Sequence, residues 1–178
     1  MIGIKGTKSG SSNGKFPGIF DTLKHCFGVI LLKDINIISL YLNPAHTLNL
    51  VSIYLFMMII PYKPMAKGES FSFENIIEGI LLTIFFICLL YLFLPRKKVG
   101  FLGFFRIMLA AEVIDVLNPI TFFLPGNLLV YFYAATLGWY FLIIVILLNK
   151  FTGMPRHIGI VYVFCVFFVV NMIPAMFY

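Results

Sequence analysis

The feature that most constrains the fold is an apolar stretch that fills nearly all of residues 43–178. Over the whole chain, 61% of residues are hydrophobic and only 11% are charged, with a mean hydropathy of +1.03. So little polar surface cannot cover a water-soluble globule. The composition excludes a soluble fold and predicts an all-α integral membrane protein whose main partner is the lipid bilayer.

Prolines, glycines and charged residues divide the stretch into five apolar segments. Each has about the 20 residues that a membrane-spanning helix needs. The first segment opens with Asn43 as a helix N-cap and Pro44 in the first turn, and it stops at Pro61. The predicted membrane domain covers residues 43–178, with spans at about 43–61, 73–94, 103–124, 127–149 and 158–176.

The N-terminal part of the chain has a different character. Residues 1–15 are rich in glycine, serine and lysine and predict a flexible cytoplasmic tail. Residues 16–42 begin with an apolar stripe at three- and four-residue steps, which predicts an amphipathic helix at the cytoplasmic interface. We expect the stripe to contact either the membrane surface or the underside of the membrane domain. Its members are Phe16, Ile19, Phe20, Leu23, Phe27, Ile30 and Leu31.

Basic residues gather in alternate gaps between the predicted spans. The first 43 residues hold five lysines and two aspartates, or +3, whereas the gaps after the second and fourth spans carry +4 and +2. The other gaps are neutral. Because cytoplasmic loops are enriched in basic residues, the pattern predicts a cytoplasmic N-terminus and an external C-terminus. Anionic lipids on that side explain the net charge of +6 without a nucleic-acid partner. The basic residues counted in the second gap are Arg96, Lys97, Lys98 and Arg106.

Motifs of catalysis are missing from the sequence. It contains no HExxH, GxSxG or CxxC motif and no glycine-rich phosphate loop. The three histidines and three cysteines are dispersed along the chain, without ligand spacing. We therefore expect no enzymatic activity, no catalytic residues, no metal site and no cofactor.

One polar cluster interrupts the third predicted span. Glu112, Asp115 and Asn118 follow one another at three-residue steps, which places them on one face of a helix near mid-bilayer. Inserting a carboxylate at that depth costs about 2.5 to 3.5 kcal/mol on translocon scales. A partner or water must offset this cost, so the three residues are the candidate binding site.

Three interpretations of this cluster remain open. The acids could pair with a polar group of another helix, such as His46, Asn49 or Asn171, or with a neighbouring subunit. They could line a proton or ion pathway. The helix could also be shallower or broken, because Pro119 follows Asn118 and removes a backbone hydrogen bond.

The fourth predicted span carries a small-xxx-small pair, Ala134 and Gly138. Such pairs let two helices approach closely, so we assign this pair to helix packing. The aromatic residues around it are interpreted as lipid-facing or packing side chains, with a ligand-binding box as the alternative. They are Tyr131, Tyr133, Trp139 and Tyr140.

The arrangement as a whole resembles the Yip (Ypt-interacting protein) domain family, in its bacterial form. The likeness extends over about residues 16–171 and includes the amphipathic cytoplasmic segment, five spans and almost no C-terminal tail. The acidic, proline-bearing cytoplasmic motif of eukaryotic members is missing, which favours a bacterial inner membrane over a Golgi location with a Rab-type partner. The residues that carry the likeness are the basic gap 96–98, Asn118 with Pro119, Pro125 with Gly126, and the run from Leu137, Gly138 and Trp139 to Gly153, Pro155 and Arg156.

The resemblance implies a non-catalytic scaffold or accessory subunit of a membrane complex, with an ABC-type exporter among the candidates. Its partners would be other integral membrane subunits or further copies of the chain. The alternative function, drawn from the polar cluster alone, is a small carrier or channel-forming subunit in which Glu112 and Asp115 line a polar path.

Overall fold

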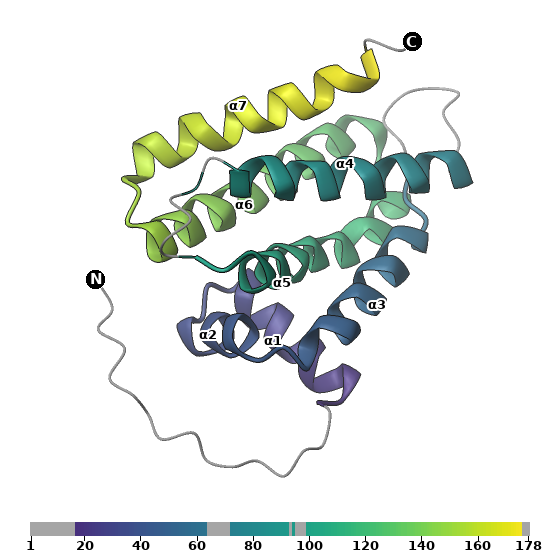
Figure 1. Ribbon diagram of the computed structural model, residues 1–178. Helices are drawn as coiled ribbons and strands as arrows, with labels where there is room; N and C mark the ends of the chain where they lie inside the picture. The colour runs from purple at the N-terminus through teal and green to yellow at the C-terminus, as the bar shows by residue number, and fades with distance from the viewer. Residues whose placement is uncertain (1–16, 64–71, 93, 95–98, 176–178) are drawn as a thin grey trace.

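The computed structural model describes residues 17–63, 72–92, 94 and 99–175. All regular secondary structure in these ranges is helical, which confirms the predicted all-α class (Figure 1). The predicted tail 1–15 and the basic residues 96–98 lie outside the described residues. The elements are α1 (Ile19–Ile30), α2 (Asp34–Leu42), α3 (His46–Ile59), α4 (Phe73–Leu92), α5 (Phe101–Ala111), the 3₁₀ helix η1 (Glu112–Phe123), α6 (Gly126–Thr152) and α7 (Arg156–Ala175).

Helix α5 lies at the centre of the bundle. It contacts α1, α2, α3, α4 and α6, and η1 continues it without a gap. Most of its side chains are buried, including the large side chains of Phe104, Ile107 and Met108. Helices α4 and α6 run alongside α5, and α7 packs on α4 and α6. Helix α3 crosses obliquely, and α1 and α2 pack beneath (Figure 1). Apart from Arg106, α5 is apolar all round, as expected of a helix at such a central position.

Three helices in the described part of the chain are individually long and apolar enough to cross a membrane. They are α4, α6 and the α7 segment Arg156–Ile173, and they coincide with the predicted spans 73–94, 127–149 and 158–176. Helix α6 has 27 residues and is about 40 Å long, which exceeds the ~30 Å hydrocarbon core. The chain is therefore a multi-pass membrane protein by the length and composition of its helices.

The other two predicted spans have a different geometry. Helix α3, within predicted span 43–61, has only 14 residues and is about 21 Å long. Helix α3 is too short to cross alone. Together with α2 it is long and apolar enough for one broken span, with a bend of 110° between the two helices. Predicted span 103–124 is an α-helix of 11 residues that continues as a 3₁₀ helix of 12. Five complete crossings therefore stay a prediction.

The amphipathic segment is a pair of helices rather than one. Leu23 and Ile30 of the predicted stripe pack on the core, together with the fully buried residues Thr22, Cys26 and Val29. Burial raises the pKa of the Cys26 thiol to about 12. The rest of the described stripe is exposed and, with part of α2, forms what we call the outer apolar face. Its residues are Ile19, Phe20, Phe27, Leu31, Ile35, Ile38 and Leu42.

Arg106 corrects the charge pattern that the sequence suggested. We expected it in the basic cytoplasmic gap, but only 5% of its surface is exposed. Its guanidinium donates to the carbonyl oxygens of Leu40, at 2.8 Å, and of Tyr41, and lies 3.4 Å from the Thr47 hydroxyl. It thus caps the C-terminal end of α2, where carbonyl groups lack partners within the helix. The ring of Tyr41 packs directly on Gly103, where a Cβ atom would lie 2.5 Å from Cε2.

The C-terminal end of α6 is also fixed. Lys150 in its last turn forms an ion pair with Asp34 in the first turn of α2, and both charges complement their helix dipoles. Gly153 then ends the helix in the left-handed conformation, with φ of 73°, which glycine adopts without strain. These contacts hold the N-terminal helices against the bundle at the end where α7 begins.

Candidate functional site

The polar cluster lies on η1, and the 3₁₀ geometry aligns it. A 3₁₀ helix has three residues per turn and rises ~2 Å per residue, so side chains three apart stack in one row about 6 Å apart. Glu112, Asp115 and Asn118 form that row, which Thr121 continues. Pro119 lies inside η1 and cannot donate a backbone hydrogen bond. The predicted shared face and the departure from a regular α-helix are therefore both found.

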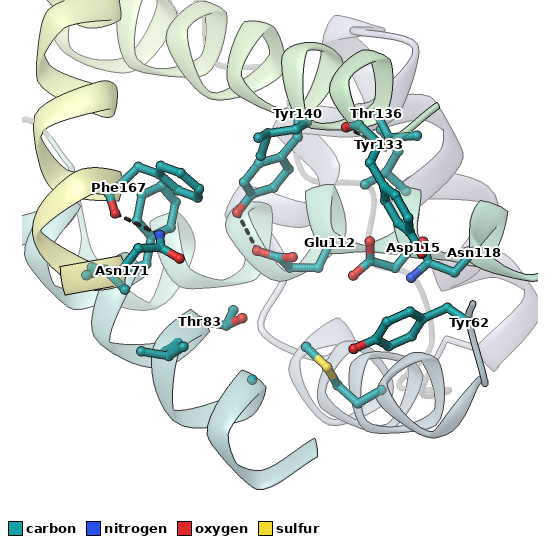
Figure 2. Close-up of a pocket in the computed structure, with 17 residues that line it drawn as sticks. Tyr62, Thr83, Glu112, Asp115, Asn118, Tyr133, Thr136, Tyr140, Phe167 and Asn171 are labelled. Carbon is teal, nitrogen blue, oxygen red and sulfur yellow. Dashed lines mark hydrogen bonds between the residues drawn. The ribbon is translucent and has the colours of Figure 1, made fainter. Parts of the chain in front are cut away.

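The row faces a cavity of about 470 Å³ between five elements of the bundle (Figure 2). Helix α6 contributes Thr136, and α7 contributes Asn171. The lining residues come from the beginning of η1, the middle of α4, the first half of α6 and the second half of α7. The full lining is Met58, Tyr62, Gly79, Leu82, Thr83, Phe86, Glu112, Ile114, Asp115, Asn118, Tyr133, Thr136, Leu137, Tyr140, Phe167, Val170 and Asn171.

The two carboxyl groups have partners within the cavity. The hydroxyl of Tyr140 on α6 donates a hydrogen bond to Oε1 of Glu112 (Figure 2). The side chain of Asn118 lies beside the carboxyl group of Asp115 and interacts with it. Both acidic residues are half-buried rather than buried. Each therefore combines a protein contact with surface that a molecule in the cavity can reach.

The partners that the sequence suggested for the acids are mostly engaged elsewhere. Nδ1 of His46 lies 2.8 Å from the hydroxyl of Thr22, and Nδ2 of Asn49 donates to the carbonyl oxygen of Pro17 at 2.7 Å. Asn171 does line the cavity, although its Nδ2 donates to the carbonyl oxygen of Phe167 at 2.8 Å. Pairing of the acids with His46 or Asn49 is therefore wrong, because those side chains fasten α3 to α1 and its N-terminal flank.

The partner that sequence reasoning missed is Tyr140. We interpreted it as a lipid-facing or packing aromatic residue, but it lines the cavity and so does Tyr133. A usable signal was present in the spacing: Tyr133, Thr136 and Tyr140 recur at three- and four-residue steps, which marks a polar stripe on one face of α6. Tyr131 and Trp139 lie on exposed surface, as interpreted.

A set of hydrogen bonds around Lys63 closes one side of the site. The backbone N–H of Lys63 donates to the Thr121 hydroxyl at 2.9 Å, and Tyr133 donates to the Lys63 carbonyl oxygen at 2.8 Å. Nζ of Lys63 donates to the carbonyl oxygen of Leu124 at 3.2 Å. The segment after α3 is thereby joined to the end of η1 and to α6, which positions Tyr62 and Tyr133 in the lining.

A buried hydroxyl group lies next to the carboxylates. Tyr54 on α3 is only 3% exposed and is close enough to interact electrostatically with Glu112 and Asp115. Its hydroxyl makes no hydrogen bond of normal geometry within the described residues, and its polar neighbour is Thr83 of the cavity lining. Buried polar groups usually have partners, so Tyr54 extends the polar region beyond the lining.

The predicted helix-packing pair lies on a different part of α6. Ala134 and Gly138 are both exposed, and nothing lies within 4 Å of where a Cβ atom on Gly138 would be. The described part of the chain makes no close helix contact at Gly138. The assignment of this pair to helix packing stays a prediction.

The chain matches no known family model, no curated protein and no solved structure. What the protein does is therefore inferred from its own residues. Within the described ranges, no group of three or more His, Cys, Asp and Glu side chains is placed to hold a metal ion. The site instead combines two carboxyl groups with hydroxyl, amide and aromatic side chains, a set suited to binding protons or small cations.

Proposed function

We propose that the protein is a small membrane carrier or channel-forming subunit, and that Glu112 and Asp115 line its polar path for a proton or a small cation. One observation carries the proposal: two carboxyl groups a single turn apart face the same cavity of about 470 Å³ among helices apolar enough for lipid. Carboxylates in a membrane are costly, and they mark substrate or proton pathways when they face a cavity.

The surroundings of the pair support this proposal. The Tyr140 hydroxyl and the Asn118 side chain offset only part of the cost of the two acids, because a normal hydrogen bond contributes ~1 kcal/mol while each acid costs about 2.5 to 3.5. A bound proton or cation offsets the remainder. The aromatic rings of the lining favour a cation further, through their negative faces.

We place the chain in a bacterial inner membrane with five crossings, the first being the bent pair α2 and α3. Lys150 in the last turn of α6 pairs with Asp34 in the first turn of α2, and Arg156 begins α7. These two basic residues therefore lie at the end of the bundle that holds the N-terminal helices, which supports a cytoplasmic N-terminus. Reporter fusions test this topology, and a cytoplasmic C-terminus would contradict it. Fusions after Lys67, Lys98, Gly126, Met154 and Tyr178 should report outside, inside, outside, inside and outside.

Transport in proteoliposomes tests the function. The purified chain should carry protons or a small cation down an imposed gradient, and Glu112→Gln combined with Asp115→Asn should abolish the flux without loss of assembly. The matched control is Glu74→Gln with Glu78→Gln, which removes two carboxylates of α4 that do not line the cavity. Equal flux in both double variants would contradict the proposal.

The second candidate is the Yip-like scaffold or accessory subunit of a membrane complex. The outer apolar face of α1 and α2 and the exposed Ala134 and Gly138 support it, because both are available to another membrane component. Co-purification from native membranes tests it. A stable complex with other integral subunits, together with no flux by the purified chain, would favour this candidate over the carrier.

A further inference from the structure

A second cavity, of about 300 Å³, forms a groove between α6 and α7. Its lining is apolar except for Arg156 at one end. The α6 residues recur at helical steps, so they form one continuous face. The full lining is Gly138, Phe141, Leu142, Val145, Ile146, Arg156, Ile160, Val163 and Phe164.

The shape of this groove depends on two glycines. Near the α6–α7 turn the helices touch, because a Cβ atom on Gly159 would lie 3.4 Å from Cγ1 of Val145. At Gly138, farther from the turn, nothing lies within 4 Å of the corresponding Cβ position. The groove on α6 from Gly138 to Ile146 is about 12 Å long. An apolar groove of this length fits part of an extended hydrocarbon chain.

The end of the groove nearest the turn is suited to an anion. Arg156 is exposed, and no acidic side chain in the described ranges pairs with it, whereas Lys150 nearby is engaged by Asp34. Arg156 is also the first residue of α7, a helix of 20 residues. The free N–H groups of a first helical turn and the helix dipole favour negative charge at the same place.

We propose that the groove binds one acyl chain of an anionic phospholipid, whose phosphate contacts Arg156 and the first turn of α7. Charge complementarity selects the headgroup, and the apolar lining selects the chain. Basic residues between spanning helices on the cytoplasmic side are a known arrangement for such headgroups. This site is separate from the cavity that Glu112 and Asp115 line, here called the carboxylate cavity, and it does not depend on the proposed transport.

Native mass spectrometry of the full chain in detergent tests the site, with phosphatidylglycerol and phosphatidylcholine of identical acyl chains as probes. The unmodified chain should retain phosphatidylglycerol about fivefold more than phosphatidylcholine. Arg156→Gln should remove the preference, and Gly138→Leu should reduce retention of both lipids. The matched controls are Lys24→Gln, an exposed basic residue of α1, and Ala135→Leu, an exposed small residue of α6 outside the groove.

Equal retention of the two lipids, or full retention by Gly138→Leu, would overturn the proposal. Glycerophosphoglycerol, the headgroup without acyl chains, should not compete, and full competition would reduce the site to an anion site alone. A second readout uses Trp139, the single tryptophan of the chain, which follows Gly138 in α6 at the groove end farther from Arg156 but is not part of the lining. Phosphatidylglycerol with chain-terminal bromines should quench its fluorescence more than brominated phosphatidylcholine, and Arg156→Gln should abolish the difference. Equal quenching by both lipids in the unmodified chain would overturn the proposal even if Gly138→Leu failed to fold.

Discussion

The Tyr140 hydroxyl on α6 donates a hydrogen bond to the carboxyl group of Glu112, which lies 28 residues earlier at the start of η1. The bond joins two of the elements that line the carboxylate cavity (Figure 2). It orients Glu112 while leaving the carboxyl group of Asp115 one turn away along η1.

Tyr140→Phe should destabilise the protein by about 1 to 3 kcal/mol, because it leaves the Glu112 carboxyl group without its donor. Unfolding in mixed micelles of increasing denaturing detergent measures the change. Tyr131→Phe is the control, since that side chain is exposed on the same helix. Equal stability of the two variants would show that the hydrogen bond does not hold the site together.

Glu112→Gln with Asp115→Asn should be tolerated or should raise the stability of the fold. The amides keep the shape of the acids and remove the cost of placing two charges in a medium of low polarity. The same unfolding assay checks this prediction. A loss comparable to that of Tyr140→Phe would mean that the charges are needed for folding.

Three of the five predicted spans and the polar row could be predicted from the sequence because both depend on local spacing. Uninterrupted apolar runs of about 20 residues mark α4, α6 and α7, since lipid imposes that length. Steps of three residues bring Glu112, Asp115 and Asn118 to one side of either an α-helix or a 3₁₀ helix. The shared face therefore did not depend on knowing which helix forms.

The contacts between distant segments could not be predicted in this way. The charge count by gap treats Arg106 as a basic loop residue. In the structure it is buried, because its guanidinium binds the carbonyl oxygens at the C-terminal end of α2. Tyr140 partners Glu112 only because α6 packs against η1. The spacing of Tyr133, Thr136 and Tyr140 marks a polar face of α6, but it does not say which residue that face meets. Both pairings depend on how the helices pack.

Replacing Arg106 should detach α2 from α5. Arg106→Met removes the hydrogen bonds to the carbonyl oxygens of Leu40 and Tyr41. Arg106→Lys keeps the positive charge, but a single ammonium group replaces the planar guanidinium that now binds both carbonyl oxygens. We expect a loss of about 2 kcal/mol or more for Met and a smaller loss for Lys. Limited proteolysis between α2 and α3 reports the change, with the exposed Lys24→Met as control. Unchanged cleavage in Arg106→Met would refute the capping role.

Phe20→Ser with Phe27→Ser should leave the spans inserted but release the N-terminal helices from the membrane surface. Phe20 is 86% exposed and belongs to the outer apolar face, so its removal costs little packing within the chain. Protease protection of α1 in membrane vesicles measures the release. Asp21→Ser with Lys24→Ser, on exposed positions of the same helix, is the control. Full accessibility of α1 in the unmodified protein would contradict the interfacial placement.

The central claim is that Glu112 and Asp115 line a polar path inside the membrane domain. Such a path must be open to water, and cysteine accessibility tests this most directly. Cys26, Cys88 and Cys165 are first replaced by alanine, and single cysteines are then introduced at Thr136, which lines the cavity, or at Ala135, which is exposed on the outside of the same helix. A charged, membrane-impermeant methanethiosulfonate reagent is added to intact cells. The account predicts that Thr136→Cys is modified and that Ala135→Cys, which faces lipid, is not. Modification of neither position, or of both at the same rate, would contradict it.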